Sequence, residues 1–110
     1  MSETKERAMI LAMTTVGGDE EAQKLASELV SRRLAACASI APNISSVYWW
    51  KGAIETSGER LVTIKTTREK IAAIEEFFKR NHPYELPELI FIECKASADY
   101  EAWVKESLIG

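Results

Sequence analysis

The chain has 110 residues, of which 46% are hydrophobic and 28% charged, and this composition is typical of one globular domain spanning residues 1–110. A net charge of −3 provides no basic surface for a nucleic acid, so we expect no nucleic-acid partner. The apolar run from Ala8 to Met13 is too short for a secretory signal or a membrane span, which predicts a cytoplasmic protein without membrane contact.

The first part of the chain predicts a strand followed by a helix. Residues 7–15 are a short apolar run that ends before two glycines, as expected for a strand buried on both faces. Asp19 is a suitable N-cap for a helix that ends near Arg33. The apolar residues of this helix recur at helical spacing: Ala22, Leu25, Ala26, Leu29 and Val30.

The middle of the chain predicts a β-hairpin. Residues 36–50 favour an outermost strand that is bent at Pro42, because proline cannot donate a hydrogen bond to a neighbouring strand. Residues 51–59 contain two glycines and predict the connection of the hairpin. Apolar alternation resumes over residues 60–67, where we expect the returning strand.

A second helix and a stiff loop follow this hairpin. Thr66 and Glu69 have the spacing of a capping box, which predicts a helix from this point to Asn81. The next segment, "NHPYELPE" at residues 81–88, contains two prolines that push the residues before them into extended conformations. It also holds the only histidine of the chain, so we expect a rigid connector that presents polar side chains in a fixed geometry.

The last segments predict a strand over residues 89–96 and a short helix over residues 97–108, with Ser97 or Asp99 as its N-cap. The resulting order is β-α-β-β-α-β plus a terminal helix, which is the ferredoxin-like α+β arrangement. Both long helices then cover one face of an antiparallel sheet.

The opposite face of this sheet is also predicted to be apolar. The first strand has apolar residues on both faces, and Ile90 and Ile92 share one face of the last strand. A monomer would leave such a face in water, so we expect a homo-oligomer. The second and last strands lie at opposite edges in this topology, so Cys37 and Cys94 are expected to be buried thiols without a bond between them.

Several motifs in this order resemble the divalent-ion-tolerance family, CutA. They are "RRLAACASI" at Arg32–Ile40, "SVYWWKG" at Ser46–Gly52, the pair Lys65 and Thr66, "HPYELPE" at His82–Glu88, and the late Tyr100 and Trp103. The resemblance implies ferredoxin-like subunits assembled into a homotrimer related to the PII signalling proteins, and a non-enzymatic role in tolerance of copper and other divalent ions.

The resemblance also implies a copper site, made in the family by one cysteine and two adjacent histidines. Thr14 stands at the cysteine position and Asn81 precedes His82, so His82 is the one expected metal ligand that remains. The alternative, which we favour, is that His82 caps the second helix and packs beside Pro83. Hydroxyl and amide groups are poor copper ligands, which predicts weak binding of copper or another divalent metal and no required cofactor.

Five polar or reactive residues of the matched motifs are candidates for a cleft between subunits: Cys37, Glu59, Lys65, Tyr84 and Glu88. They suit either a network of ion pairs between subunits, which we favour, or a site for an unidentified anionic or metal-bearing small ligand or a protein partner. The alternative function is therefore a small enzyme or a ligand-binding regulator with an intersubunit site.

Three adjacent aromatic residues, Tyr48, Trp49 and Trp50, end the predicted edge strand. Their alternation across the strand suits anchoring on a neighbouring subunit of the trimer. A stacking platform for bases is the other interpretation, and the acidic balance of the chain disfavours it.

Overall fold

The computed structural model describes residues 9–109. In chain order its elements are β1 (Met9–Val16), α2 (Asp19–Ser31), β2 (Cys37–Trp50), β3 (Ala53–Thr67), the short 3-10 helix η1 (Arg68–Lys70), α3 (Ile71–Asn81), β4 (Ile90–Cys94) and α4 (Ala98–Ser107). The predicted order of strands and helices and the α+β class are confirmed. Residues 7 and 8, which the sequence predicts as part of the first strand, lie outside the described residues.

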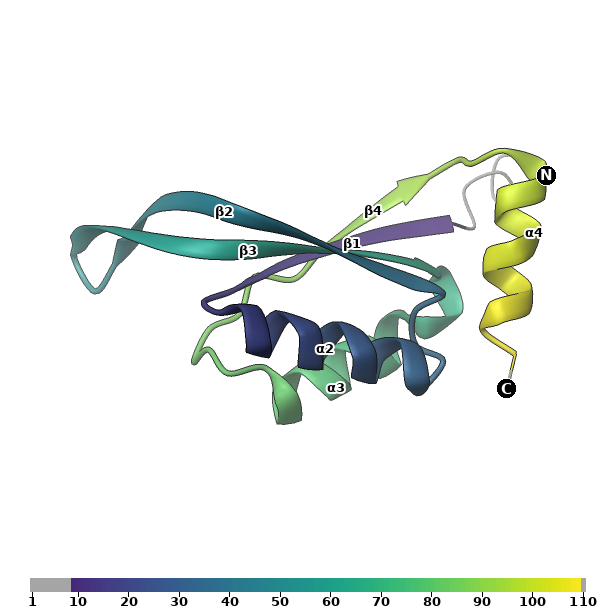
Figure 1. The fold of residues 1–110 in the computed structure, drawn as a ribbon, viewed down its shortest axis with the longest axis horizontal. Helices are drawn as coiled ribbons and strands as arrows, with labels where there is room; N and C mark the ends of the chain where they lie inside the picture. The colour runs from purple at the N-terminus through teal and green to yellow at the C-terminus, as the bar shows by residue number, and fades with distance from the viewer. Residues whose placement is uncertain (1–8, 110) are drawn as a thin grey trace.

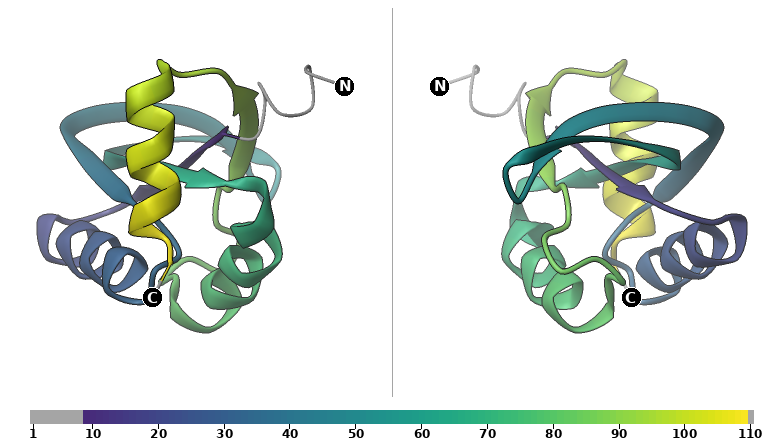
Figure 2. Two further views of the ribbon diagram at one scale, coloured as in Figure 1. Left: turned by 90° about the vertical axis from the view of Figure 1, so that its right-hand side faces the viewer. Right: turned by 90° about the vertical axis from the view of Figure 1, so that its left-hand side faces the viewer.

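The strands form one antiparallel sheet in the order β2-β3-β1-β4. Helices α2 and α3 lie side by side against the same face of this sheet (Figures 1 and 2). The edge positions of β2 and β4 match the prediction, and Cys37 and Cys94 on these two edges are free thiols.

The main core lies between the sheet and these two helices. Its buried apolar residues are Ala12, Val16, Ala22, Leu25, Leu29, Ala35, Val62, Ile64, Ile74, Phe77 and Phe78. The helical spacing of α2 and α3 and the alternation of β3 place these side chains on the facing surfaces. Val30 was predicted on the buried side of its helix but is 39% exposed, because it lies at the margin of the buried stripe.

Strands β2 and β3 continue past the end of β1 as a two-stranded ribbon, on the left of Figure 1. The predicted hairpin connection over residues 51–59 is wrong. The turn is only Lys51 and Gly52, both with positive φ (51° and 85°), as tight two-residue hairpin turns require. The predicted bend of β2 is confirmed as a register shift between Ala41 and Ile44.

Two predicted helix starts differ from the structure. Gly18, not Asp19, is the N-cap of α2; Asp19 is the first helical residue, and its carboxylate accepts a hydrogen bond from Arg60. The capping box predicted at Thr66 does not form, since the Thr66 hydroxyl donates to the carbonyl of Leu34. Helix α3 instead follows η1 directly, with Lys70 as its N-cap.

Helix α4 begins as predicted at Ser97, whose Oγ accepts a hydrogen bond from the backbone N–H of Tyr100. It buries Val104 and Leu108 together with Met9, at the end of the molecule opposite the ribbon (Figure 1). No helix within residues 9–109 is long and apolar enough to cross a membrane.

The sheet face away from α2 and α3 remains partly open, and we call it the outer face. Its apolar residues alternate with the core residues along their strands: Leu11, Met13, Leu61, Ile90 and Ile92. Ile90 is 47% exposed and Ile92 is 43% exposed. The predicted apolar second face is therefore present in one chain.

Candidate functional site

A pocket of about 880 Å³ lies between the ribbon and the loop that joins α3 to β4. We call it the acidic pocket; it is lined by Thr15, Gly17, Ser46, Val47, Tyr48, Trp49, Trp50, Ser57, Gly58, Glu59, Pro83, Tyr84, Glu85, Leu86 and Glu88. It forms where β1 ends at Val16 and leaves the continuing part of β3 open to the loop. The rigid connector predicted at residues 81–88 thus forms one wall of the pocket.

Glu59 and Tyr84 meet inside this pocket. The Tyr84 hydroxyl donates to Glu59 Oε2 at 2.8 Å, and Glu59 is only 5% exposed. Burial raises the pKa of Tyr84 above its ordinary value, and the hydrogen bond to Glu59 raises it further by stabilising the protonated phenol. Burial also raises the pKa of Glu88, with the negative charge of Glu59 as the second cause.

His82 fixes the start of the loop on β1. Its Nδ1 accepts the backbone N–H of Tyr84 at 3.1 Å, so the neutral ring carries its proton on Nε2. This Nε2–H faces the carbonyl of Thr15 and the hydroxyl of Thr14, each at 3.1 Å. The ring also contacts the rings of Phe78 and Tyr84. Burial lowers the pKa of His82, so the neutral form that fits these partners is favoured.

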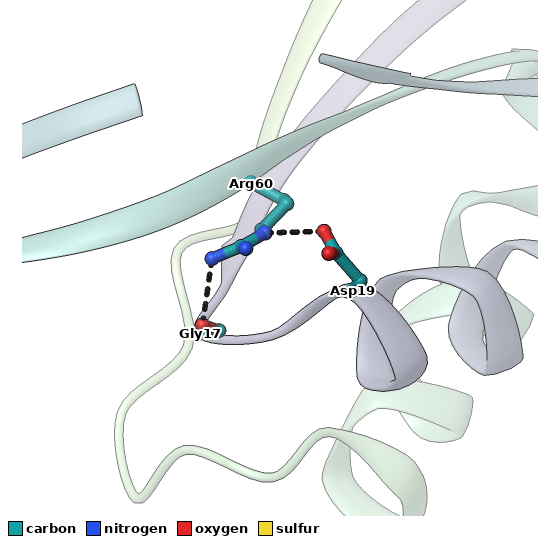
Figure 3. A network of polar contacts seen from close by, with 3 residues as sticks. All are labelled: Gly17, Asp19 and Arg60. Atoms are coloured by element: carbon teal, nitrogen blue, oxygen red, sulfur yellow. Dashed lines mark hydrogen bonds and ion pairs between the residues drawn. The ribbon is translucent and has the colours of Figure 1, made fainter. Parts of the chain in front are cut away.

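Arg60 follows Glu59 on β3 and bonds to the turn between β1 and α2 (Figure 3). Its Nε donates to Asp19 Oδ1 at 2.6 Å, and its Nη1 donates to the carbonyl of Gly17 at 3.0 Å. The hydrogen bond from Arg60 lowers the pKa of Asp19. Arg60 therefore ties the β1–α2 turn to β3, and its guanidinium is committed to Asp19 rather than to Glu59.

Cys37 and Lys65, two of the five predicted cleft residues, do not line the acidic pocket. Lys65 Nζ donates to Ser39 Oγ at 2.8 Å and contacts Cys37 Sγ at 3.8 Å. Lys65 is six residues along β3 from Glu59, about 20 Å in an extended strand. Within one chain Glu59, Tyr84 and Glu88 lie together and apart from Cys37 and Lys65, and the predicted cleft between subunits stays a prediction. No sequence motif indicates the part played by Ser39.

The residues at the predicted metal positions are engaged in hydrogen bonds. Thr14 is fully buried against His82, and the Asn81 side-chain amide donates to the carbonyl of Phe77 at 2.9 Å. Within residues 9–109, no group of three or more His, Cys, Asp or Glu side chains is placed to hold a metal ion. Metal binding by His82 stays a prediction, and a metal would have to displace the Tyr84 N–H or the Nε2 proton.

The predicted aromatic anchors all line the acidic pocket at its ribbon side. Trp49 is 71% exposed and Tyr48 is 41% exposed, while Trp50 is half-buried with Lys51 Nζ 5.6 Å from its ring centroid. The Tyr48 hydroxyl lies 3.3 Å from Ser57 Oγ across the ribbon. The ribbon therefore presents a large aromatic surface to solvent in a single chain.

Both the sequence and the fold are similar to those of known CutA proteins. The family model described as CutA1 divalent ion tolerance protein matches residues 10–107. The structure of CutA from Synechococcus elongatus PCC7942 is similar with a TM-score of 0.88 and 40% sequence identity, covering 93% of this chain and 91% of that chain.

Two curated relatives illustrate the range of similarity. Protein CutA 1, chloroplastic, of Oryza sativa subsp. japonica is 40% identical over 99 residues, which are 89% of this chain and 56% of that protein. The divalent-cation tolerance protein CutA of Escherichia coli strain K12 / DH10B is 34% identical over 102 residues, 92% of this chain and 91% of that protein. The chain thus spans about half the length of the chloroplastic relative and most of the bacterial one.

Proposed function

The chain belongs to the CutA1 divalent ion tolerance protein family, and from this premise we propose that it acts in divalent-cation tolerance as a homotrimer without catalytic activity. The observation that supports assembly is the exposure of apolar side chains on the outer face. Each large apolar side chain left in water forgoes roughly 1.5–3 kcal/mol of burial, so covering Ile90, Ile92 and their neighbours favours association.

The ribbon supplies a second contact for the trimer. Val47, Trp49 and Ile54 are 68%, 71% and 62% exposed, and they lie beyond the part of the sheet that α2 and α3 cover. Aromatic side chains with this exposure suit anchoring on another subunit. Tyr48, Trp49 and Trp50 then contact a neighbouring chain, and the acidic pocket beside them faces the boundary between subunits.

The assembly is tested by sedimentation equilibrium of wild type and Ile92→Glu. A charge on the outer face should dissociate the trimer, because it would be buried without a partner. Val30→Glu is the matched control, since Val30 is similarly exposed but lies on α2, on the opposite layer. Equal dissociation by both substitutions, or by neither, would contradict assembly through the outer face.

Metal binding in this proposal is weak and centres on His82, with copper or another divalent ion as the ligand and no required cofactor. The chemistry of the surrounding groups supports the low affinity, because the threonine hydroxyl and asparagine amide beside the imidazole are poor ligands for copper. A cytoplasmic location stays a prediction.

A second candidate function is a small enzyme that uses Cys37, and the contact of Lys65 with the thiol favours it. The histidine of the chain instead bonds to Thr15 at the end of β1 nearer the ribbon, so it is not placed as the base for Cys37. Labelling of native Cys37 with a thiol reagent tests this function, and labelling no faster than that of half-buried Cys94 would exclude it.

A further inference from the structure

Cys37 and Lys65 face each other across β2 and β3, at the end of β3 away from the acidic pocket. Lys65 Nζ lies 3.8 Å from Cys37 Sγ and donates to Ser39 Oγ at 2.8 Å. Cys37 and Ser39 are two residues apart on β2, so their side chains share one face of the strand, and Sγ lies 3.9 Å from Oγ. A thiol, a hydroxyl and an amine therefore form one cluster.

The fold of a single chain sets this cluster. Cys37 and Lys65 are direct partners in the register of β2 and β3, which pair over residues 37–41 and 61–65. The backbone N–H of Ala36 donates to the carbonyl of Lys65 at 2.9 Å and fixes the same register. Opposed residues of an antiparallel pair have Cβ atoms about 4.5–5.5 Å apart. Since hydrogen bonds within the chain hold the pair together, it does not depend on how subunits pack.

An amine at this position changes what happens to an oxidised thiol. Hydrogen peroxide converts a cysteine thiol to a sulfenic acid, which either condenses with a nucleophile or is oxidised further to irreversible acids. The only other thiol of the chain, Cys94, lies on the opposite edge strand and does not face Cys37. The nitrogen nucleophile beside Cys37 is Lys65 Nζ. A group held this close reacts with a large advantage over a second molecule of peroxide.

We propose that Cys37 and Lys65 form a reversible sulfenamide bridge when the protein meets hydrogen peroxide. The sulfur first attacks one peroxide oxygen and the O–O bond breaks, which oxidises sulfur to the sulfenic acid and reduces peroxide to water. The amine, after giving its additional proton to solvent, forms an N–S bond. The S–O bond breaks, and the departing hydroxide takes one proton from nitrogen and leaves as a second water.

The bridge has two consequences for the molecule. It joins β2 to β3 covalently, and it protects Cys37 from irreversible oxidation until a thiol reductant cleaves the N–S bond. Ser39 Oγ accepts a hydrogen bond from the amine and holds it beside the sulfur. The site is a redox modification site that does not rest on the proposed role in divalent-cation tolerance.

Mass spectrometry of the peroxide-treated full chain tests the bridge. After catalase removes the peroxide, the denatured chain should be lighter than the reduced chain by about 2 Da, because two hydrogens are lost, and dithiothreitol should restore its mass. Trypsin does not cleave after a bridged lysine, so the digest should contain residues 34–51 joined to residues 61–68. A joined pair that is about 16 Da heavier would retain an oxygen and would overturn the sulfenamide step.

Variants separate the amine from its charge. Lys65→Arg keeps a positive donor for Ser39 but has no amine, so it should form no bridge, and Cys37 should gain about 32 or 48 Da as an irreversible acid. Cys94 is the internal control, because its partner across the strands is Met9, and it should form no bridge to a lysine. A thermal melt verifies that the variant folds.

Four results would overturn the proposal. In the wild type they are an unmodified Cys37, a Cys37 found only as an irreversible acid, and a Cys37 found only in a disulfide with another chain. The fourth is the same loss of about 2 Da in Lys65→Arg, which would assign the nitrogen to another group.

Discussion

Replacing His82 by alanine should destabilise the fold measurably, because the ring joins the loop wall of the acidic pocket to β1. The wild-type ring accepts the N–H of Tyr84 and donates to the carbonyl of Thr15. It also provides the polar partner of the fully buried Thr14 hydroxyl. Alanine removes all of these contacts and the packing of the ring against Phe78.

The size of the effect follows from these contacts. Two neutral hydrogen bonds contribute about 0.5–1.5 kcal/mol each, and a buried hydroxyl left without a partner costs about 1–3 kcal/mol. Solvent that enters the vacated space offsets part of this loss, so we expect His82→Ala to lower the free energy of unfolding by about 2–4 kcal/mol. His82→Gln retains an amide donor for Thr15 and should lose less than the alanine variant.

Urea unfolding at a fixed protein concentration measures both variants, and it should be repeated at several pH values. The folded pKa of His82 is lowered below its unfolded value of about 6.5, so its contribution is complete above that pH. The contribution is lost as the pH falls from about 6.5 through the lowered folded pKa, because the unfolded state then binds the additional proton. A loss below about 0.5 kcal/mol for His82→Ala, or the same pH dependence in His82→Gln, would refute this role of the ring.

Three further results are expected. Copper titration should show weak binding to wild type that disappears in His82→Ala and is lost in acid as the ring protonates below its lowered pKa, and submicromolar binding that survives the substitution would place the metal elsewhere. Glu59→Gln should change the free energy of unfolding by less than about 1 kcal/mol, because the amide oxygen still accepts the Tyr84 hydroxyl, and a loss above about 2 kcal/mol in urea unfolding would contradict this. Ile74→Ala should cost about 2–5 kcal/mol through the cavity it leaves in the core, and a loss under about 1 kcal/mol by the same assay would show that α3 is loosely packed.

The fold was predictable because most elements bury one face and therefore carry a periodic apolar pattern. The ribbon is the exception, since residues 53–58 pair only with β2 and lie mostly exposed. Without a buried face they show no alternation, and Gly58 together with Gly52 of the turn led to the wrong prediction of a long turn. The N-cap of α2 was also predicted wrongly. Asp19 bonds to Arg60, which lies 41 residues further along the chain, and no local sequence pattern indicates such a contact.

The types of residue in the candidate site were predictable from the sequence. Which of these residues lie together in one chain was not. Tyr84 and Glu88 lie in one stiff loop, so their proximity follows from the sequence. Their meeting with Glu59 depends on β3 continuing past the end of β1, which only the strand register shows. Cys37 and Lys65 belong to the other end of β3, and a linear motif does not distinguish the two ends of one strand.

Native mass spectrometry of the full chain, purified without added metal, tests the proposed trimer most directly. Burial of the outer face and anchoring of the ribbon predict one dominant species at three times the mass of a single chain, maintained at micromolar protein concentration. A dominant monomer under the same conditions would contradict the account, because Ile90, Ile92 and Trp49 would then remain in water with no subunit to cover them.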